Sequence, residues 1–389
     1  MAVSTTAVTA FIGSSEYSTP EVSTSSPTEA FFENGTVYPS DYYYYPDDDD
    51  YGVCRYESHG ATFLPVLYSI FFLVGLLGNS LVIWVIVCGV RLRSMTDVCL
   101  LNLSLADLLL VCTLPFLAHQ ARDHWVFGDE MCKVVLGIYH IAFYCGIFFI
   151  SLMSIDRYLA IVHAVYAMRA RTRSFGIMAA ALAWLAGFLA SVSDVIFLKQ
   201  QQQKGSNLTY CYSQYPSDTL DPSSSTNPHF WRVFNLLKMN IVGLLLPIVI
   251  MGFCYTQIIW RLLWSQSSKK QAIRLVLMVV AAFFCCWVPY NLASLFKALE
   301  LLHVYTACES SKAIRLALQI TESIAYSHSC LNPVLYVFVG QKFRRHLLRL
   351  INRAPCRLCQ TIKVFLPQDR INGSAYSQTT SLDERSTAV

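Results

Sequence analysis

The sequence carries little charge for its length, and this scarcity limits the kinds of protein that it can encode. Asp, Glu, Lys and Arg make up 14% of the 389 residues, whereas roughly a quarter of a typical soluble domain is charged. Hydrophobic residues make up 54%, and the mean hydropathy is +0.43. These values exclude an ordinary water-soluble domain and indicate that lipid is the main solvent of the chain.

Several other signals are missing. The opening "MAVSTTAVTAFIGSS" has no basic region and too short an apolar run for a cleaved secretory signal, so the first long span is expected to act as the signal anchor. No paired half-sequences or ion-lining charges favour a transporter or channel. No convergent nucleophile or metal-ligand set predicts an enzyme, and no feature predicts nucleic-acid binding.

Long apolar runs are what the sequence has instead. A membrane-spanning helix needs about 20 mostly apolar residues, because lipid cannot satisfy an exposed backbone. Seven runs qualify: about 61–90, 97–119, 131–155, 175–198, 230–262, 273–299 and 313–339. The sequence therefore predicts an all-α membrane protein, a seven-helix bundle over residues 54–340. A disordered acidic segment (1–53) precedes it, and a short amphipathic cytoplasmic helix (341–352) and a disordered tail (353–389) follow it.

Basic residues in alternate loops predict the orientation. They fall in the first, third and fifth loops and in the tail segment "QKFRRHLLRLINR", and in the loops they are Arg91, Arg93, Arg169, Arg171, Arg173, Arg261, Lys269, Lys270 and Arg274. Short cytoplasmic loops are enriched in Lys and Arg. We therefore expect a multi-pass plasma-membrane protein with an extracellular N-terminus.

The N-terminal segment is strongly acidic. Residues 1–60 contain ten acidic residues and one basic residue, a net charge of −9. Such a segment predicts a basic extracellular partner. It includes Tyr42, Tyr43, Tyr44 and Tyr45 beside acids, which suits tyrosine sulfation and partner binding, although a merely solvated acidic tail fits the same composition.

Other outer positions predict covalent modifications. Asn34 and Asn207 are glycosylation acceptors. Cys54, Cys132, Cys211 and Cys308 fall in outer segments, where oxidation favours two disulfides. Four cysteines allow three pairings; we favour Cys132–Cys211 with Cys54–Cys308. Cys356 and Cys359 follow the basic amphipathic segment and are candidates for palmitoylation and lipid attachment.

Polar residues inside the apolar runs form a first candidate site. Asp107, Asn79, His328 and Asn332 lie within three different runs. Polar groups in hydrocarbon are costly and usually functional. Two interpretations stay open, a satisfied polar cluster that fixes helix packing and an allosteric sodium site. No other cofactor is expected.

A second candidate site lies nearer the outer face. Glu322 is ten residues before Asn332, which places it about 15 Å farther along the helix. Tyr68 and Tyr139 fall at similar depths. A carboxylate among aromatic rings suits a cationic ligand group, and the alternative is a water-facing residue in an open vestibule. Prolines at 115, 247, 289 and 333 favour kinked helices and a hinge.

Together these motifs resemble those of rhodopsin-like G-protein-coupled receptors. They occur in order: "GN" at 78–79, "LADL" around Asp107, "DRY" at 156–158, Trp184, "CWVP" at 286–289 and "NPVLY" at 332–336. The stretches "TLPF", "DHWVFGDEMCK", "DRYLAIVHAV" and "NPVLYVFVGQKFRRHL" are similar to CC chemokine receptors, nearest to the type 4 and type 8 group. The resemblance covers about residues 54–352.

The resemblance implies a receptor that couples CC chemokine binding to Gi-type heterotrimeric G proteins, and so promotes leukocyte chemotaxis and calcium mobilisation. It implies that Tyr290 joins Glu322, Tyr68 and Tyr139 in the pocket and that Trp287 shifts on activation. Asp156 would restrain Arg157, next to Tyr158, until the sixth helix swings about Pro289. Arg157 would then extend toward Tyr255 and Tyr336 and line a cavity for the C-terminal helix of a Gα subunit, and Asn332 and Pro333 would also take part in activation. Arrestin would bind the phosphorylated tail.

Two departures and one rival accompany this resemblance. Leu117 stands where many chemokine receptors have Trp after "TLPF". No acid occurs between Asp221 and Glu300, so a second carboxylate clamp on Arg157 is absent, and we expect raised basal activity. The rival is an atypical scavenging receptor, which binds chemokine without G-protein signalling; such receptors typically depart from "DRY", which this chain keeps.

Overall fold

The computed structural model describes residues 60–90, 92, 94–163, 171–202, 207–215, 230–263, 270–304, 307–338 and 341–353. All of them belong to one compact unit, Val37–Val389; the other unit, Met1–Thr36, falls outside the described residues.

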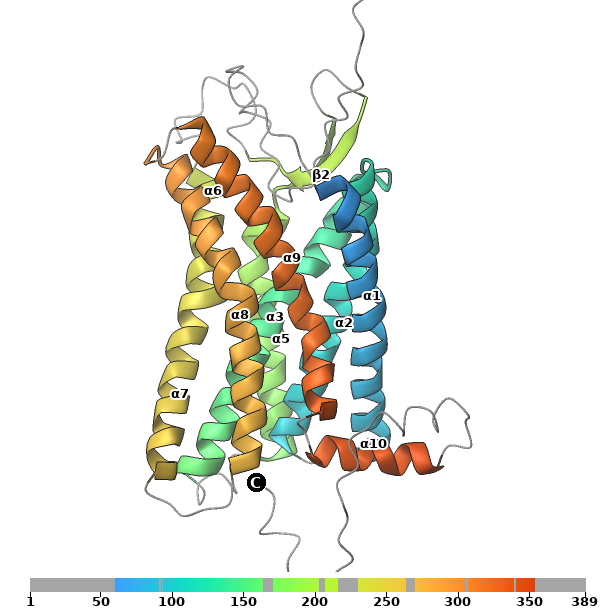
Figure 1. Cartoon of the computed structure of the whole chain (residues 1–389), viewed down its shortest axis with the longest axis vertical. Coiled ribbons are helices and arrows are strands. Elements are labelled where there is room, and N and C mark those ends of the chain that lie inside the picture. Colours follow the sequence, from blue (N-terminus) through green and yellow to red (C-terminus); the bar gives the residue numbers. More distant parts are fainter. Residues whose placement is uncertain are drawn as a thin grey trace, which may run out of the picture. The chain divides into compact units, whose positions relative to one another are not determined.

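Long helices dominate the described chain (Figure 1). In order they are α1 (Gly60–Val85), α2 (Met95–Arg122), α3 (Gly128–Val162), α5 (Arg173–Val195), α6 (Phe230–Asn240) continued by α7 (Leu246–Leu263), α8 (Lys270–Leu301) and α9 (Cys308–Phe338). Single π-helical turns, η2 (Ile86–Val90) and η4 (Ile241–Leu245), extend α1 and join α6 to α7. The expected helical membrane bundle is confirmed.

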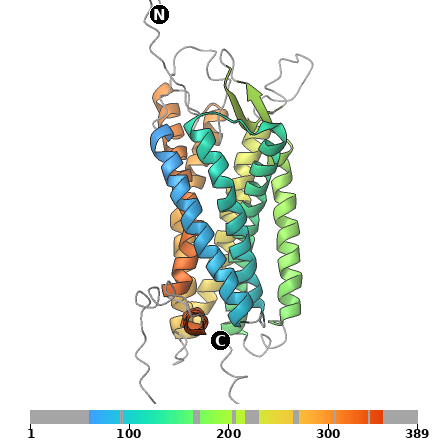
Figure 2. The same cartoon turned by 90° about the vertical axis from the view of Figure 1, so that its right-hand side faces the viewer.

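A β-hairpin and a short helix mark the opposite ends of the bundle. Strands β1 (Leu198–Gln202) and β2 (Thr209–Ser213) pair antiparallel, with Leu198 opposite Ser213. They lie over one end, and α10 (Gln341–Arg353) crosses the other end at a steep angle to the long helices (Figures 1 and 2). We call these the hairpin end and the α10 end.

Among the described residues, six helical segments are long and apolar enough to cross a membrane. They include the combined α6–η4–α7 segment, Phe230–Arg261, with a hydropathy of 2.1 over its most apolar window. Helix α9, which covers the seventh apolar run, has 31 residues but contains Glu309, Lys312, Arg315 and Glu322. It packs against α1, α2 and α8, so its polar residues are partly covered by protein rather than lipid.

Local sequence signals explain the helix starts at the α10 end. Ser94 caps α2: its hydroxyl accepts from the Asp97 backbone N–H at 3.3 Å, and the Asp97 carboxylate accepts from the Ser94 backbone N–H at 3.0 Å. The Thr172 hydroxyl caps α5 through the Phe175 backbone N–H. Such capping satisfies backbone donors that the first helical turn leaves unpaired.

The expected prolines lie within or at the start of the helices. Pro115, Pro289 and Pro333 are inside α2, α8 and α9, which continue through them. Pro247 is the second residue of α7, directly after the π-helical turn η4. The sequence interpretation missed Pro65, inside α1, and both π-helical turns.

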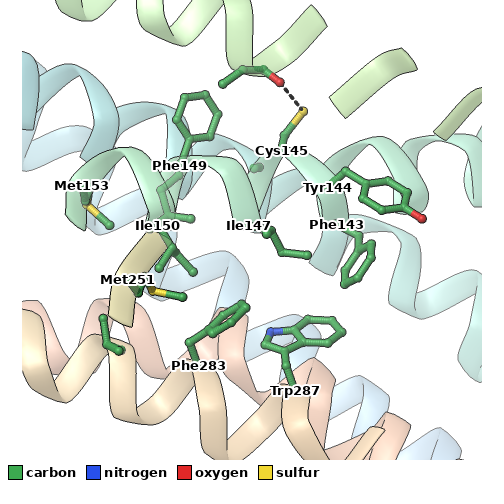
Figure 3. Packing of buried hydrophobic residues seen from close by; sticks show 14 of the residues in the cluster. Phe143, Tyr144, Cys145, Ile147, Phe149, Ile150, Met153, Met251, Phe283 and Trp287 are labelled. Carbon is green, nitrogen blue, oxygen red and sulfur yellow. Dashed lines mark hydrogen bonds between the residues drawn. The ribbon is translucent and has the colours of Figure 1, made fainter. Parts of the chain in front are cut away.

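Helix α3 carries the main core. It contacts α2, α5 and α7, and its apolar side chains interlock with those of α7 and α8 (Figure 3). Phe283 and Phe149 are fully buried there. A second buried cluster, which contains Tyr68, Trp125 and Tyr139, lies toward the hairpin end. The core therefore links the candidate site near the hairpin to the helix ends near α10.

Candidate functional site

A disulfide and several hydrogen bonds attach the hairpin to the helical bundle. Cys132, in the first turns of α3, forms a disulfide with Cys211 in β2, which is one of the two expected pairs. Gln120 of α2 accepts from the Cys211 backbone N–H at 3.0 Å and donates to its carbonyl at 3.4 Å. The Trp125 N–H donates to the Thr209 carbonyl at 2.7 Å. The hairpin is thereby held beside the pocket described next.

The expected pocket residues gather around a tyrosine that the sequence interpretation missed. The Tyr326 hydroxyl donates to Glu322 Oε1 at 2.9 Å. The Tyr326 ring centroid lies 5.3 Å from that of Tyr68 and 5.7 Å from that of Tyr139, both edge to face. All four residues are buried. The spacing of four residues between Glu322 and Tyr326 on one helix is the signal that could have found it.

The chemical character of this buried group, which we call the pocket, follows from its residues. Glu322 is a buried carboxylate with an aromatic wall drawn from α1, α3 and α9. A charge in such a site favours a cationic partner, because the surroundings screen it poorly. Leu117, the departure noted in the sequence, is 8% exposed and belongs to the same buried cluster.

Below the pocket, Trp287 lies at the centre of an aromatic group. Its ring centroid is 4.7 Å from that of Phe143, 6.2 Å from that of Tyr290 and 6.4 Å from that of His328. Figure 3 shows the Trp287 ring of α8 close to the Phe143 ring of α3. The Asn291 side-chain amide donates to the Trp287 carbonyl at 2.9 Å, two residues either side of Pro289.

The intramembrane polar residues come from α1, α2 and α9. Asn332 Nδ2 donates to Asp107 Oδ2 at 2.8 Å, and Asn79 Nδ2 donates to the carbonyls of Gly75 and Ser329, each at 3.0 Å. Within the described residues, Asn79 Oδ1, Asn332 Oδ1 and His328 Nε2 are buried without a hydrogen-bond partner. The structure joins Asp107 to Asn332, and it packs the His328 ring against Phe283 and Trp287.

At the α10 end, Asp156 is fully buried, and its main partner is not its neighbour. Arg171 donates to both carboxylate oxygens, from Nε at 2.7 Å and from Nη2 at 3.2 Å. The Thr96 hydroxyl donates to Oδ2 at 2.6 Å. Arg157 Nε is 3.8 Å from Oδ2. The sequence interpretation used Arg171 only as an orientation charge; its spacing from Asp156 carried no local signal.

The tyrosines expected near Arg157 have different surroundings. The Tyr255 hydroxyl is 3.3 Å from the Ser154 hydroxyl, and Tyr158 bonds His163 Nε2 at 3.0 Å. The Tyr336 hydroxyl is buried and has no hydrogen-bond partner among the described side chains. Trp184, another motif residue, donates from Nε1 to Asn102 Oδ1 at 2.9 Å and so joins α5 to α2.

Several expected residues lie outside the described residues. They are Tyr42, Tyr43, Tyr44, Tyr45, Asn34, Cys54, Cys356 and Cys359. Cys308 begins α9, but its side chain is not described, so the pairing Cys54–Cys308 stays a prediction. Asn207 is exposed just before β2, where a glycan has room.

The chain is similar to known receptors over most of its length. Residues 78–336 match the family model described as "7 transmembrane receptor (rhodopsin family)". The chain is 41% identical to the human (Homo sapiens) C-C chemokine receptor type 8, over 86% of this chain and 92% of that protein. It is 44% identical to the rhesus macaque (Macaca mulatta) C-C chemokine receptor type 3, over 83% and 90%.

The chain belongs to the C-C chemokine receptor family, within the rhodopsin-like G-protein-coupled receptors. The receptor is thus a multi-pass protein of the plasma membrane and not an enzyme. Identities of 44% to human type 1 and 41% to human type 4 do not separate the subtypes. The pocket around Glu322 and the pair Asp156–Arg157 lie at opposite ends of a receptor bundle.

Proposed function

We propose that this receptor binds a CC chemokine at the hairpin end and activates a Gi-type heterotrimeric G protein at the α10 end, promoting leukocyte chemotaxis and calcium mobilisation. The observation that carries the proposal is the similarity to C-C chemokine receptors over more than four-fifths of the chain. The N-terminus is then extracellular, as the basic residues of the alternate loops also favour.

Chemokine binding begins at the acidic N-terminal segment and ends in the pocket. Residues 1–60 carry a net charge of −9, which attracts a basic protein. Sulfate on Tyr42, Tyr43, Tyr44 and Tyr45 would add to this charge. The N-terminus of the chemokine then enters the bundle, where Glu322 accepts its cationic group and Tyr326 holds the carboxylate in place. The rings of Tyr68 and Tyr139 exclude water from this contact.

Activation requires that the ligand favour one of two helix arrangements, since a ligand shifts a conformational equilibrium only by its differential affinity for the two states. Trp287 lies between Tyr290 and Phe143, so a ligand that displaces Tyr290 presses on Trp287. Pro289 removes one helical hydrogen bond nearby. Helix α8 can therefore swing at this point, which opens the α10 end for the C-terminal helix of a Gα subunit.

The buried hydroxyl of Tyr336 gives a physical reason for a second, active arrangement of the helices. A buried hydroxyl without a hydrogen bond costs about 1–3 kcal/mol, and the Tyr336 hydroxyl has no partner within the described chain. In the active state, Arg157 extends toward Tyr255 and Tyr336 and lines the cavity that receives Gα. Asp156 then keeps its hydrogen bonds with Thr96 and Arg171.

The polar residues of α1, α2 and α9 fit a sodium ion in the inactive state. Sodium prefers oxygen ligands, and Asp107 together with the unpaired Asn79 Oδ1 and Asn332 Oδ1 offers buried oxygens. Such an ion would neutralise the buried Asp107 charge. His328 supplies a nitrogen and packs against aromatic rings, so it suits a supporting position. Within the described residues, no group of three or more His, Cys, Asp or Glu side chains could hold a metal ion.

The tail and α10 would bind two further partners, arrestin and membrane lipid. Arrestin would bind the Ser- and Thr-rich tail after phosphorylation adds negative charge. Palmitate on Cys356 and Cys359 would anchor the chain just after α10 to membrane lipid. Buried Leu347 and Ile351 already hold α10 against Val85 of α1.

A chemokine panel tests the proposal. Cells that express the receptor with a surface tag would be treated with each CC chemokine, and the Gi-dependent fall in cAMP measured with and without pertussis toxin. We expect at least one chemokine to lower cAMP in a toxin-sensitive manner, and the Arg157→Gln variant to bind that chemokine without the response. Chemokine uptake without any toxin-sensitive response would instead identify a scavenging receptor.

A further inference from the structure

The contacts of Asp156 raise a question about which arginine the carboxylate restrains. Its side chain is fully buried, so each of its oxygens needs a partner. Arg171 and the Thr96 hydroxyl already supply three donors, at 2.6 to 3.2 Å. Arg157, 3.8 Å away, lies beyond hydrogen-bond distance.

Arg171 binds Asp156 in the stronger of the two geometries. A guanidinium that donates to both oxygens of one carboxylate forms a charge-assisted bidentate pair, which is among the strongest polar contacts in proteins. Arg171 Nη2 also donates to the Thr96 hydroxyl at 3.1 Å. Arg171, Thr96 and Asp156 therefore form a closed triangle of hydrogen bonds, whereas Arg157 keeps only a longer electrostatic attraction.

The backbone around Arg171 is fixed, so this triangle is preorganised. Its carbonyl accepts from the Met95 backbone N–H at 3.4 Å, and the next residue, Thr172, forms a β-bridge with Ser94. Gly176, one turn into α5, lies so close to Met95 that a Cβ would stand 2.9 Å from the Met95 Cα. The starts of α2 and α5 are therefore in direct contact, and Arg171 lies between them.

Helices α6, α7 and the α10 end of α8 provide no second acid to restrain Arg157, and Asp97 at the start of α2 adds only a smaller attraction than Asp156. No acidic residue occurs between Asp221 and Glu300, a range that includes α6, α7 and the α10 end of α8. The main acidic restraint on Arg157 is thus Asp156, which Arg171 shares.

We propose that Arg171 competes with Arg157 for the Asp156 carboxylate and so raises the population of receptor in which Arg157 is available to the G protein. Arg171 is a positioning residue, since it acts through Asp156 and need not touch the G protein. Without Arg171, Arg157 becomes the nearest cation to Asp156, and the inactive arrangement gains stability. This inference rests on the proposed coupling to a Gi-type protein.

Nucleotide loading measures the effect on Arg157. Membranes from cells that express matched surface amounts of receptor with Gαi would be assayed for GTPγS binding without chemokine. We expect Arg171→Ala to lower the basal rate about fivefold, which corresponds to about 1 kcal/mol. Arg171→Lys keeps the charge but not the bidentate geometry, so it should give an intermediate rate. Arg173→Ala, an exposed cation two residues away, serves as the matched control and should leave the rate unchanged.

An Asp156→Asn background separates competition from a general structural role. In this background residue 156 carries no carboxylate for which the two arginines could compete, so Arg171→Ala should no longer change the basal rate. An equal fall in both backgrounds, or a basal rate that Arg171→Ala leaves unchanged or raises in the native background, would overturn the proposal.

A second measurement does not depend on G-protein coupling. Melting temperatures of the detergent-purified receptor would be determined for the double-mutant cycle of Arg171→Ala with Asp156→Asn, and for that of Arg157→Ala with Asp156→Asn. We expect the larger coupling for Arg171. A larger coupling for Arg157 refutes the competition. If no chemokine drives nucleotide loading, the proposed function is wrong, but the double-mutant cycles still test whether Arg171 and Arg157 compete for Asp156.

Discussion

The hydrogen bond between Tyr326 and Glu322 gives the sharpest test of the pocket geometry. The donor and acceptor residues are 1% and 5% exposed, and the bond is 2.9 Å long. Tyr326→Phe deletes only the hydroxyl, because the ring keeps its packing between Tyr68 and Tyr139. A hydrogen bond to a charged group contributes about 1.5–3 kcal/mol to stability. We therefore expect Tyr326→Phe to destabilise the receptor by about this amount.

Thermal unfolding of the detergent-purified receptor measures this loss. The variants are Tyr326→Phe, Glu322→Gln and the two combined, so that the coupling between the two side chains can be separated from their other contacts. Tyr212→Phe is the matched control, because the Tyr212 hydroxyl donates to the neutral Gln201 Oε1 at 2.8 Å. A bond to a neutral acceptor contributes only about 0.5–1.5 kcal/mol, so the control should lose less stability.

Two results would refute this reasoning. The first is an equal melting temperature for Tyr326→Phe and the native receptor, which would mean that Glu322 does not depend on this hydroxyl. The second is additivity of the two variants, which would mean that the loss of stability comes from elsewhere in the pocket.

In chemokine binding, Glu322→Gln should weaken affinity more than Tyr326→Phe, because it removes the charge itself rather than the group that orients it.

Three further predictions concern the framework. Gly176→Ala should lower the melting temperature, because overpacking against α2 backbone costs about 1–3 kcal/mol, while Gly146→Ala, where a Cβ meets nothing within 4 Å, should not. Gln120→Ala should speed hydrogen exchange in the hairpin, because it leaves the Cys211 backbone N–H and carbonyl unpaired. Partial burial lowers the pKa of His346, so protonation of this side chain favours undocked α10. Docking of α10 should therefore weaken as the pH falls below about 6.5. Hydrogen exchange of residues 341–353, corrected for intrinsic rates, should then rise, and His346→Gln should remove this pH dependence.

Much of the fold follows from the sequence because hydrocarbon imposes a simple length rule. The six most apolar helices stand out on hydropathy alone. Helix α9 is less apolar than these six, but its run 313–339 was still long and apolar enough to be predicted as the seventh span. The π-helical turns were not predictable, since "IVCGV" and "IVGLL" differ little from the apolar sequence around them.

The candidate sites show a similar division. Tyr326 follows Glu322 by one helical turn, so a helical projection would have revealed it. Arg171 is different, because it lies just before α5, whereas Asp156 lies in α3. The start of α5 approaches α2 through Gly176, a contact between segments far apart in sequence. Spacing along a single helix carries no information about such a contact.

The two ends of the receptor are joined by one face of α9. Glu322, Tyr326, Ser329, Asn332 and Tyr336 follow one another at steps of four, three, three and four residues, which places them on the same side of a helix. All five are buried. A shift of α9 that a ligand imposes at Glu322 therefore moves Asn332 and its bond to Asp107, whereas Tyr336 lies beyond Pro333. Because the helix from Glu322 to Asn332 contains no proline and resists bending, the Asn332 contact with Asp107 cannot stay unchanged when the contacts of Glu322 are remade.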